Sequence, residues 1–296
     1  MLALGIVAAV AASLLYNTSI ALQAVEARKE PDEHSLRPSL LGRLLRNKRW
    51  LVATAIGLLG WPLEIAALLL APLTVVQPCV ASGLVLLLWL GARRLGEAPG
   101  AREAASVTAI VAGVGGLALA APDRSTDHAG AASIAIALGL VAIPVALPYL
   151  FRGRGSAAVT LAVFSAGCGY AWTAIATKLL TDELAAGTVL VGVAWLATVA
   201  ASESLGLLSE MSALQRRPAT RVAPVAFAVQ VLVPVILAPL IFDEAWRDTP
   251  LGGAVLAASI AVAVAGIVLL AGSRPVGAVL ESAHTEKQTG AEGARC

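Results

Sequence analysis

Three features of the sequence predict an all-α, polytopic membrane protein. Of the 296 residues, 58% are hydrophobic and 14% are charged, and the mean hydropathy is +0.83. Soluble domains carry about 25% charged residues. The apolar residues form continuous runs of about 20 residues, the length that crosses a bilayer as a helix. Because membrane β-strands instead alternate apolar and polar residues, we expect a bundle of helices.

Nine apolar stretches are long enough to be membrane helices. They contain 197 residues and three charged side chains, whereas the other 99 residues contain 37. A signal peptide begins with basic residues and has a shorter apolar segment than the first stretch, which has no basic start. We therefore expect this stretch to be an uncleaved helix. The stretches are 1–25, 50–72, 74–92, 104–121, 131–151, 157–177, 188–213, 222–242 and 250–272.

The positive charges predict the orientation of these helices. With nine spans, 18 of the 21 lysines and arginines fall on one side of the membrane and three on the other. Positively charged loops stay in the cytoplasm. We therefore expect a plasma-membrane protein with an external N-terminus, a basic cytoplasmic loop at 26–49 and a disordered cytoplasmic tail at 273–296. Within the loop, 39–50 is either a basic amphipathic helix on the inner leaflet or a solvated linker.

Two halves of the chain share an internal pattern. Both contain E-x2-A-L-x3-P-x-T-x-V-x-P, starting at Glu64 and again at Glu210, at a constant offset of 146 residues. Upstream, Thr18 matches Thr173 at an offset of 155. A shared glutamate within a membrane span, followed by prolines in register, indicates a repeat rather than chance similarity.

The repeat predicts the domain organisation. The first repeat covers residues 1–121, the second covers 157–272, and the helix at 131–151 links them. Equivalent positions are separated by an odd number of spans, so the second repeat enters the membrane from the opposite side. An inverted 4+4 repeat of this kind is a recurrent arrangement in secondary transporters.

The first motif resembles a known superfamily. Trp61, Glu64 and Ala67-Leu68 are followed by Ala71-Pro72, Val76 and Pro78, and the motif ends at Leu95-Gly96-Glu97. This pattern is similar to the EamA-type repeats of the drug/metabolite transporter superfamily, and most similar to its nine-helix branch, which includes NIPA-type magnesium transporters. The second half has Phe242-Asp243-Glu244 in place of Leu-Gly-Glu. The resemblance implies transport but leaves the substrate open.

Three acidic residues inside the spans are the first candidates for a binding site. Ionisable groups at membrane depth are costly unless they are paired or hydrated, so Glu64, Glu203 and Glu210 are functional candidates. Glu203 lies two turns from Glu210 on the same helix face, deeper in the span, where a proton-coupling site would be expected. The structural alternatives are a salt bridge of Glu210 with Arg216 or Arg217, and hydrogen bonds between helices for Glu64 and Glu203.

Neutral polar residues in the spans could line the same site. Tyr16 is one of them, and amides and hydroxyls of this kind either bind ligands or join helices. The candidates to bind a substrate or ion are Asn17, Gln77, Tyr170 and Gln230.

The sequence argues against several other functions. The net charge of +2 is too small for a nucleic-acid-binding surface, and no nucleotide-binding or paired Cys/His motif occurs. We therefore expect no enzyme activity, no cofactor and no nucleic-acid partner, while a metal site is left undetermined. The lipid bilayer is the expected partner, and a homo-oligomer is compatible with the pattern.

Three functions remain after these exclusions. The first is a secondary transporter that moves a small metabolite or amphipathic compound by alternating access. The second is transport of Mg²⁺ or another divalent cation, which prefers oxygen ligands. The third is a non-transporting membrane scaffold that presents its basic loop and tail to partners.

Overall fold

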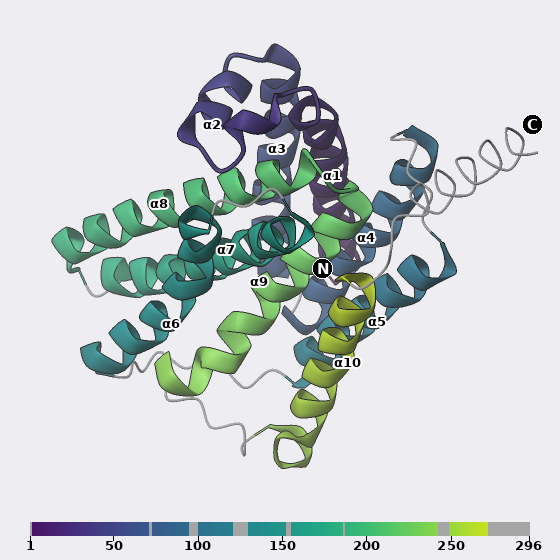
Figure 1. Ribbon diagram of the computed structural model, residues 1–296. Coiled ribbons are helices and arrows are strands. Elements are labelled where there is room, and N and C mark those ends of the chain that lie inside the picture. Colours follow the sequence, from purple (N-terminus) through teal and green to yellow (C-terminus); the bar gives the residue numbers. More distant parts are fainter. Residues whose placement is uncertain are drawn as a thin grey trace, which may run out of the picture.

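The computed structural model describes residues 2–70, 73–94, 100–120, 130–151, 155–185, 187–241 and 249–271, and these form ten α-helices without a strand (Figure 1). Two short 3₁₀ helices accompany them, η1 (Asp32–His34) and η3 (Pro250–Gly253). The α-helices are α1 (Leu2–Ala27), α2 (Pro38–Leu44), α3 (Lys48–Leu70), α4 (Leu73–Arg94), α5 (Ala101–Ala120), α6 (Ala131–Leu150), α7 (Ser156–Ala185), α8 (Val189–Leu214), α9 (Ala219–Ile241) and α10 (Ala254–Ala271).

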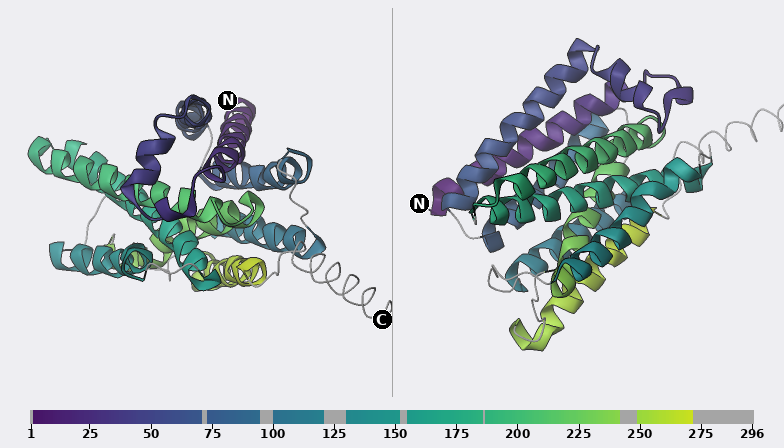
Figure 2. Two further views of the ribbon diagram at one scale, coloured as in Figure 1. Left: turned by 45° about the horizontal axis from the view of Figure 1, so that its top comes forward. Right: turned by 90° about the vertical axis from the view of Figure 1, so that its left-hand side faces the viewer.

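The chain is a multi-pass, all-α membrane protein. Among the described residues, five segments are long and apolar enough to cross a bilayer: Ala3–Ala27, Ala131–Leu150, Ser156–Thr177, Val189–Leu214 and Pro250–Leu269. Each of the nine apolar stretches in the sequence overlaps a long helix. Two further helices contain shorter apolar segments, Gly83–Arg93 and Ala219–Pro234. The long helices lie roughly side by side, as the right-hand view of Figure 2 shows.

The helices pack in two similar groups. In the first, α1 lies against α3 and α4, and in the second, α7 lies against α8 and α9. Helix α6 packs on α7, where the Ser165 hydroxyl donates a hydrogen bond to the Val145 carbonyl, 2.9 Å away. The expected linker helix is thus in direct contact with the second group. Helix α5 packs on α4 of the first group, and α10 packs on α9 of the second. Contacts of α4 with α9, and of α5 with α10, then join the two groups.

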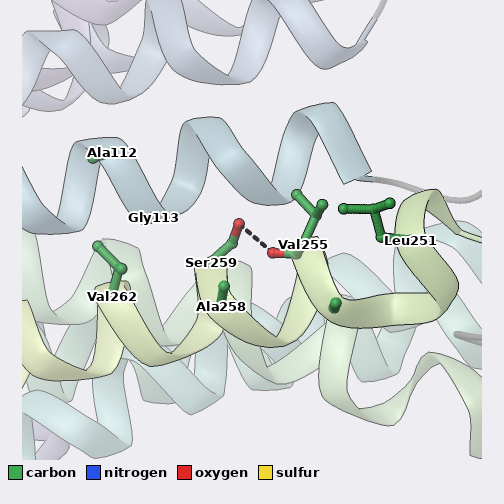
Figure 3. A pocket seen from close by; sticks show the side chains of 8 residues that line it. Ala112, Gly113, Leu251, Val255, Ala258, Ser259 and Val262 are labelled. Atoms are coloured by element: carbon green, nitrogen blue, oxygen red, sulfur yellow. Dashed lines mark hydrogen bonds between the residues drawn. The ribbon is translucent and has the colours of Figure 1, made fainter.

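Small residues allow α5 and α10 to approach closely. A Cβ atom at Gly113 would lie 2.7 Å from the Ala263 backbone nitrogen and 2.8 Å from the Ser259 carbonyl oxygen. At Gly266, it would lie 2.8 Å from the Ser106 carbonyl. On the outer side, a shallow groove of about 410 Å³ runs between the two helices, and Ser259 bonds to its own helix there (Figure 3). Close backbone contact therefore holds this pair together.

The connector between α1 and α3, residues 28–47, is folded against the bundle. Its helix α2 begins at Pro38 and ends at Leu44, so it is shorter than the amphipathic helix expected at 39–50. Leu40 and Leu44 are fully buried and α2 contacts α8. The buried leucines of α2 therefore face protein, and the segment is not a solvated linker. A short helix was expected in this segment and is present over part of the range. Its contact with α8 was not expected, because the sequence does not show that α8 offers an apolar partner.

We expect Gly113→Ala to destabilise the bundle. The added methyl group would overlap backbone atoms of α10, which cannot move aside as a side chain could, at a cost of about 1–3 kcal/mol. Thermal unfolding of the purified protein in detergent measures the change. Gly139→Ala on α6 is the matched control, because nothing lies within 4 Å of a Cβ there. Equal melting temperatures for the two variants would contradict the proposed packing.

Candidate functional site

The same tyrosine–glutamate pair occurs in both groups of helices. The Tyr16 hydroxyl on α1 donates a hydrogen bond to Glu64 Oε2 on α3, 2.7 Å away. The Tyr170 hydroxyl on α7 donates to Glu210 Oε2 on α8 at 2.5 Å. These short distances fit O–H donors on carboxylate acceptors. Each group thus joins its first two long helices through one acidic side chain.

A glycine one turn before each glutamate makes room for the tyrosine ring. A Cβ atom at Gly60 would lie 2.7 Å from Tyr16 Cε1, and one at Gly206 would lie 3.0 Å from the Tyr170 ring. Gly60 and Gly206 are 146 residues apart, as are the two glutamates. The sequence interpretation missed this glycine pair, and it named Tyr16 as a lining residue without pairing it with Glu64. The shared offset is the signal that could have found the glycines.

A second close contact also occurs in both groups. On the first side, α1 meets α4 where a Cβ at Gly83 would lie 1.9 Å from Ser13 Oγ. On the second side, α7 meets α9 where a Cβ at Gly167 would lie 2.6 Å from Val229 Cβ. Gly83 and Val229 are again 146 residues apart. The glycine lies on α4 in the first group and on α7 in the second, but the two helices approach closely at both crossings.

The two glutamates differ in burial. Glu210 is 5% exposed, whereas Glu64 is only partly buried. Helix α8 is largely exposed along its first half and continuously buried from Leu208 to Leu214, which includes Glu210. The interior pairing of Glu210 with Tyr170 replaces the salt bridge with Arg216 or Arg217 considered from the sequence. For Glu64, the hydrogen bond between helices is the contact observed.

The other predicted site residues belong to neither pair, and some lie outside the described part. Glu203 is exposed on α8, where it forms a hydrogen bond with Thr173 of α7, and Gln230 is partly buried on α9. Asn17 is 5% exposed and its Nδ2 donates to the Ser13 carbonyl, while its Oδ1 has no hydrogen-bond partner among the described residues. The Gln77 side chain, the motif residues 95–97 and 242–244, and the tail at 273–296 lie outside the described residues.

A chain of hydroxyl groups lies beside the second pair. Ser209, which precedes Glu210, is bonded to the Tyr149 hydroxyl at 2.8 Å and to the Ser165 hydroxyl at 2.9 Å. Tyr149 also donates to the Leu205 carbonyl. These bonds join α6, α7 and α8 at the level of Glu210, so they fix the position of the helix that carries it.

Arginines gather at the end of the bundle where α8 stops and α9 begins. Arg217 Nη2 donates to the Ser156 hydroxyl at 2.8 Å and to the Thr160 hydroxyl at 2.9 Å, both on α7. Arg221 Nη2 donates to Glu103 on α5 at 2.7 Å. Partial burial, and secondly the neighbouring Arg221, lower the pKa of the Arg217 guanidinium below its usual range. These contacts bring the ends of four helices together.

The two pairs offer acceptor oxygens inside an apolar bundle, which can hold a proton or a cationic group. Among the described residues, no group of three His, Cys, Asp or Glu side chains is placed to hold a metal ion. Comparison with protein-family models, with curated proteins and with solved structures finds no match to this chain.

Tyr170→Phe is expected to lower the stability of the protein more than Tyr16→Phe. Removing the Tyr170 hydroxyl leaves a carboxyl group that is 5% exposed without its donor, which costs about 1–3 kcal/mol. Glu64 is partly exposed and loses less. Thermal unfolding in detergent measures both changes, and a double-mutant cycle of Tyr170→Phe with Glu210→Gln isolates the pair. A larger loss for Tyr16→Phe would contradict the difference in burial.

Proposed function

We propose that the protein is a secondary transporter of the drug/metabolite type, which moves a small metabolite or amphipathic compound by alternating access. One observation carries this proposal: a tyrosine, a glycine and a buried or half-buried glutamate form the same contact in both groups of helices. A structural brace needs only one such contact. Two related contacts, one in each group, suit a binding site that is opened from either side.

The proposal includes an inverted repeat. Helices α1, α3, α4 and α5 would correspond to α7, α8, α9 and α10, with α6 between them. The support is a constant offset of 146 residues. It relates the two glutamates, the two glycines beside the tyrosines, and the crossing positions Gly83 on α4 and Val229 on α9. In this scheme, nine spans place the N-terminus outside the plasma membrane and the basic end of the bundle in the cytoplasm.

The two glutamates differ in burial, and this difference fits one state of the proposed cycle. In the described conformation, the Glu210 pair is closed off and the Glu64 pair is partly accessible. If the two repeats exchange conformations, the accessible pair becomes buried and the buried pair becomes accessible. Each glutamate would then take up or release a proton or a cationic substrate on its own side.

The first experiment is a search for the substrate. Purified protein is heated with a panel of small metabolites, amphipathic cations and divalent ions including Mg²⁺, because a ligand that binds the folded state raises the apparent melting temperature. Stabilisation by metabolites or amphipathic compounds supports the proposal. Stabilisation by Mg²⁺ alone favours the second candidate, divalent cation transport, which rests on the resemblance to NIPA-type proteins.

Transport of the stabilising compound is then expected to depend on both glutamates. Glu64→Gln and Glu210→Gln each remove a carboxylate interaction worth roughly 1–3 kcal/mol, so gradient-driven uptake into proteoliposomes should fall about fivefold or more. Glu33→Gln, whose side chain is 68% exposed in the connector, is the matched control and should transport normally. Unchanged uptake by both glutamate variants would rule out this mechanism.

A further inference from the structure

The connector, residues 28–47, is unusual because only one of the two groups of helices has such a segment. Helix α1 ends at Ala27 and α3 begins at Lys48, whereas the corresponding helices of the second group, α7 and α8, are separated only by residues 186–188. The connector therefore belongs to one group, and its contacts with the other group need an explanation beyond chain connection.

These contacts concentrate on the end of α8 that carries Glu210. The backbone N–H of Leu36 donates to Ser212 Oγ at 2.9 Å, and Gln215 Nε2 donates to the Glu30 carbonyl at 3.1 Å. Just after the connector, Trp50 Nε1 donates to Met211 Sδ at 3.4 Å. In Figure 1, α2 lies at the top of the view, beside this end of α8. The contacted residues follow Glu210 by one to five positions.

The contact is well packed and held in a defined backbone conformation. Leu36 is 6% exposed and has a φ of 56°, a left-handed conformation that residues other than glycine rarely adopt. Leu40, Leu44 and Met211 are fully buried in the same hydrophobic cluster. A segment that only joined two helices would not need this conformation or these buried leucines.

The two ends of the connector are fastened to one another. Glu26 accepts hydrogen bonds from Lys29 at 2.5 Å and from Asn47 Nδ2 at 2.7 Å. Asn47 Oδ1 in turn accepts from the backbone N–H of Arg49, at the start of α3. These bonds tie the connector to the ends of α1 and α3, the two helices that it joins.

We propose that the connector is a lid on the end of α8 that carries Glu210. It closes the arginine-rich end of α8 in the described conformation and must leave Ser212 and Gln215 before that end can open. The inference rests on the proposed transport function, since it supplies the gate for one side of the cycle. Among the described residues, the link between α7 and α8 contains no comparable segment.

The test measures access to position 210 with a charged maleimide that reacts only with exposed thiols. The full chain, with Cys79, Cys168 and Cys296 replaced by Ala, carries a reporter substitution, Glu210→Cys or Glu64→Cys. Leu40→Ala loosens the lid by removing a fully buried leucine. Ser212→Ala removes the acceptor of the Leu36 N–H, together with the hydroxyl's own hydrogen bond to the Leu208 carbonyl within α8. Leu45→Ala is the matched control, because Leu45 is 56% exposed at the end of α2.

We expect slow labelling of the reporter at position 210 in the intact background. Labelling should become about tenfold faster or more with Leu40→Ala or Ser212→Ala and stay unchanged with Leu45→Ala, while the reporter at position 64 is unaffected by all three. No acceleration at position 210 with either variant would overturn the lid. Equal acceleration at both reporters would also overturn it, because general loosening would then explain the result.

This outcome is separate from that of the transport assay. Labelling needs no substrate and no gradient, so a failed lid test leaves the dependence of transport on Glu64 and Glu210 as it stands. Conversely, a lid that opens in the labelling assay, in a protein whose Glu→Gln variants transport normally, refutes the transport mechanism alone.

Discussion

A carboxyl group inside an apolar bundle must have a hydrogen-bond donor, and much of the second half of this protein is arranged around that requirement for Glu210. Leaving such a group without a partner costs more than the hydrogen bond itself is worth. The Tyr170 hydroxyl supplies the donor, but only if α7 and α8 approach closely enough for the aromatic ring to lie across α8. Gly206 allows this approach, and the bonds of Ser209 to Tyr149 and Ser165 hold α8 in place beside α6 and α7.

The same requirement explains where large and small residues are placed. Each tyrosine ring crosses the neighbouring helix at a glycine, and each first helix meets the third helix of its group at another glycine. At that second contact, the glycine lies on α4 in one group and on α7 in the other. At a helix crossing, the space limits only the combined volume of the two facing side chains. Either helix can therefore carry the small residue. The geometry is therefore kept even though the residues are not.

The helical fold was predictable from the sequence, and the contacts of the site were predictable only in part. Continuous apolar runs fix helix positions in a membrane protein, so the expected stretches and the observed helices agree to within a few residues at most ends. Glu64 and Glu210 could be selected because charge is rare within the spans. Tyr16 and Tyr170 were also named, but their pairing with the glutamates could not be predicted, because a hydrogen bond between two helices depends on how the helices rotate against each other. Glu203 shares a face with Glu210 by spacing, yet Glu203 is exposed, while its neighbour Ser202 is buried and bonded to Thr173 on α7.

The connector was the least predictable part because its folding depends on a partner distant in sequence. Its leucines have the spacing of an amphipathic helix, which by itself fits a membrane surface or a protein surface equally well. What decides between them is the end of α8, where Met211, Leu214 and the hydroxyl of Ser212 complete a surface that α2 and Leu36 cover. Two groups of helices with similar internal contacts thus differ most in one added segment. The added segment makes the two ends of the described bundle unequal, because the connector packs on one end of α8 and only residues 186–188 join its other end to α7.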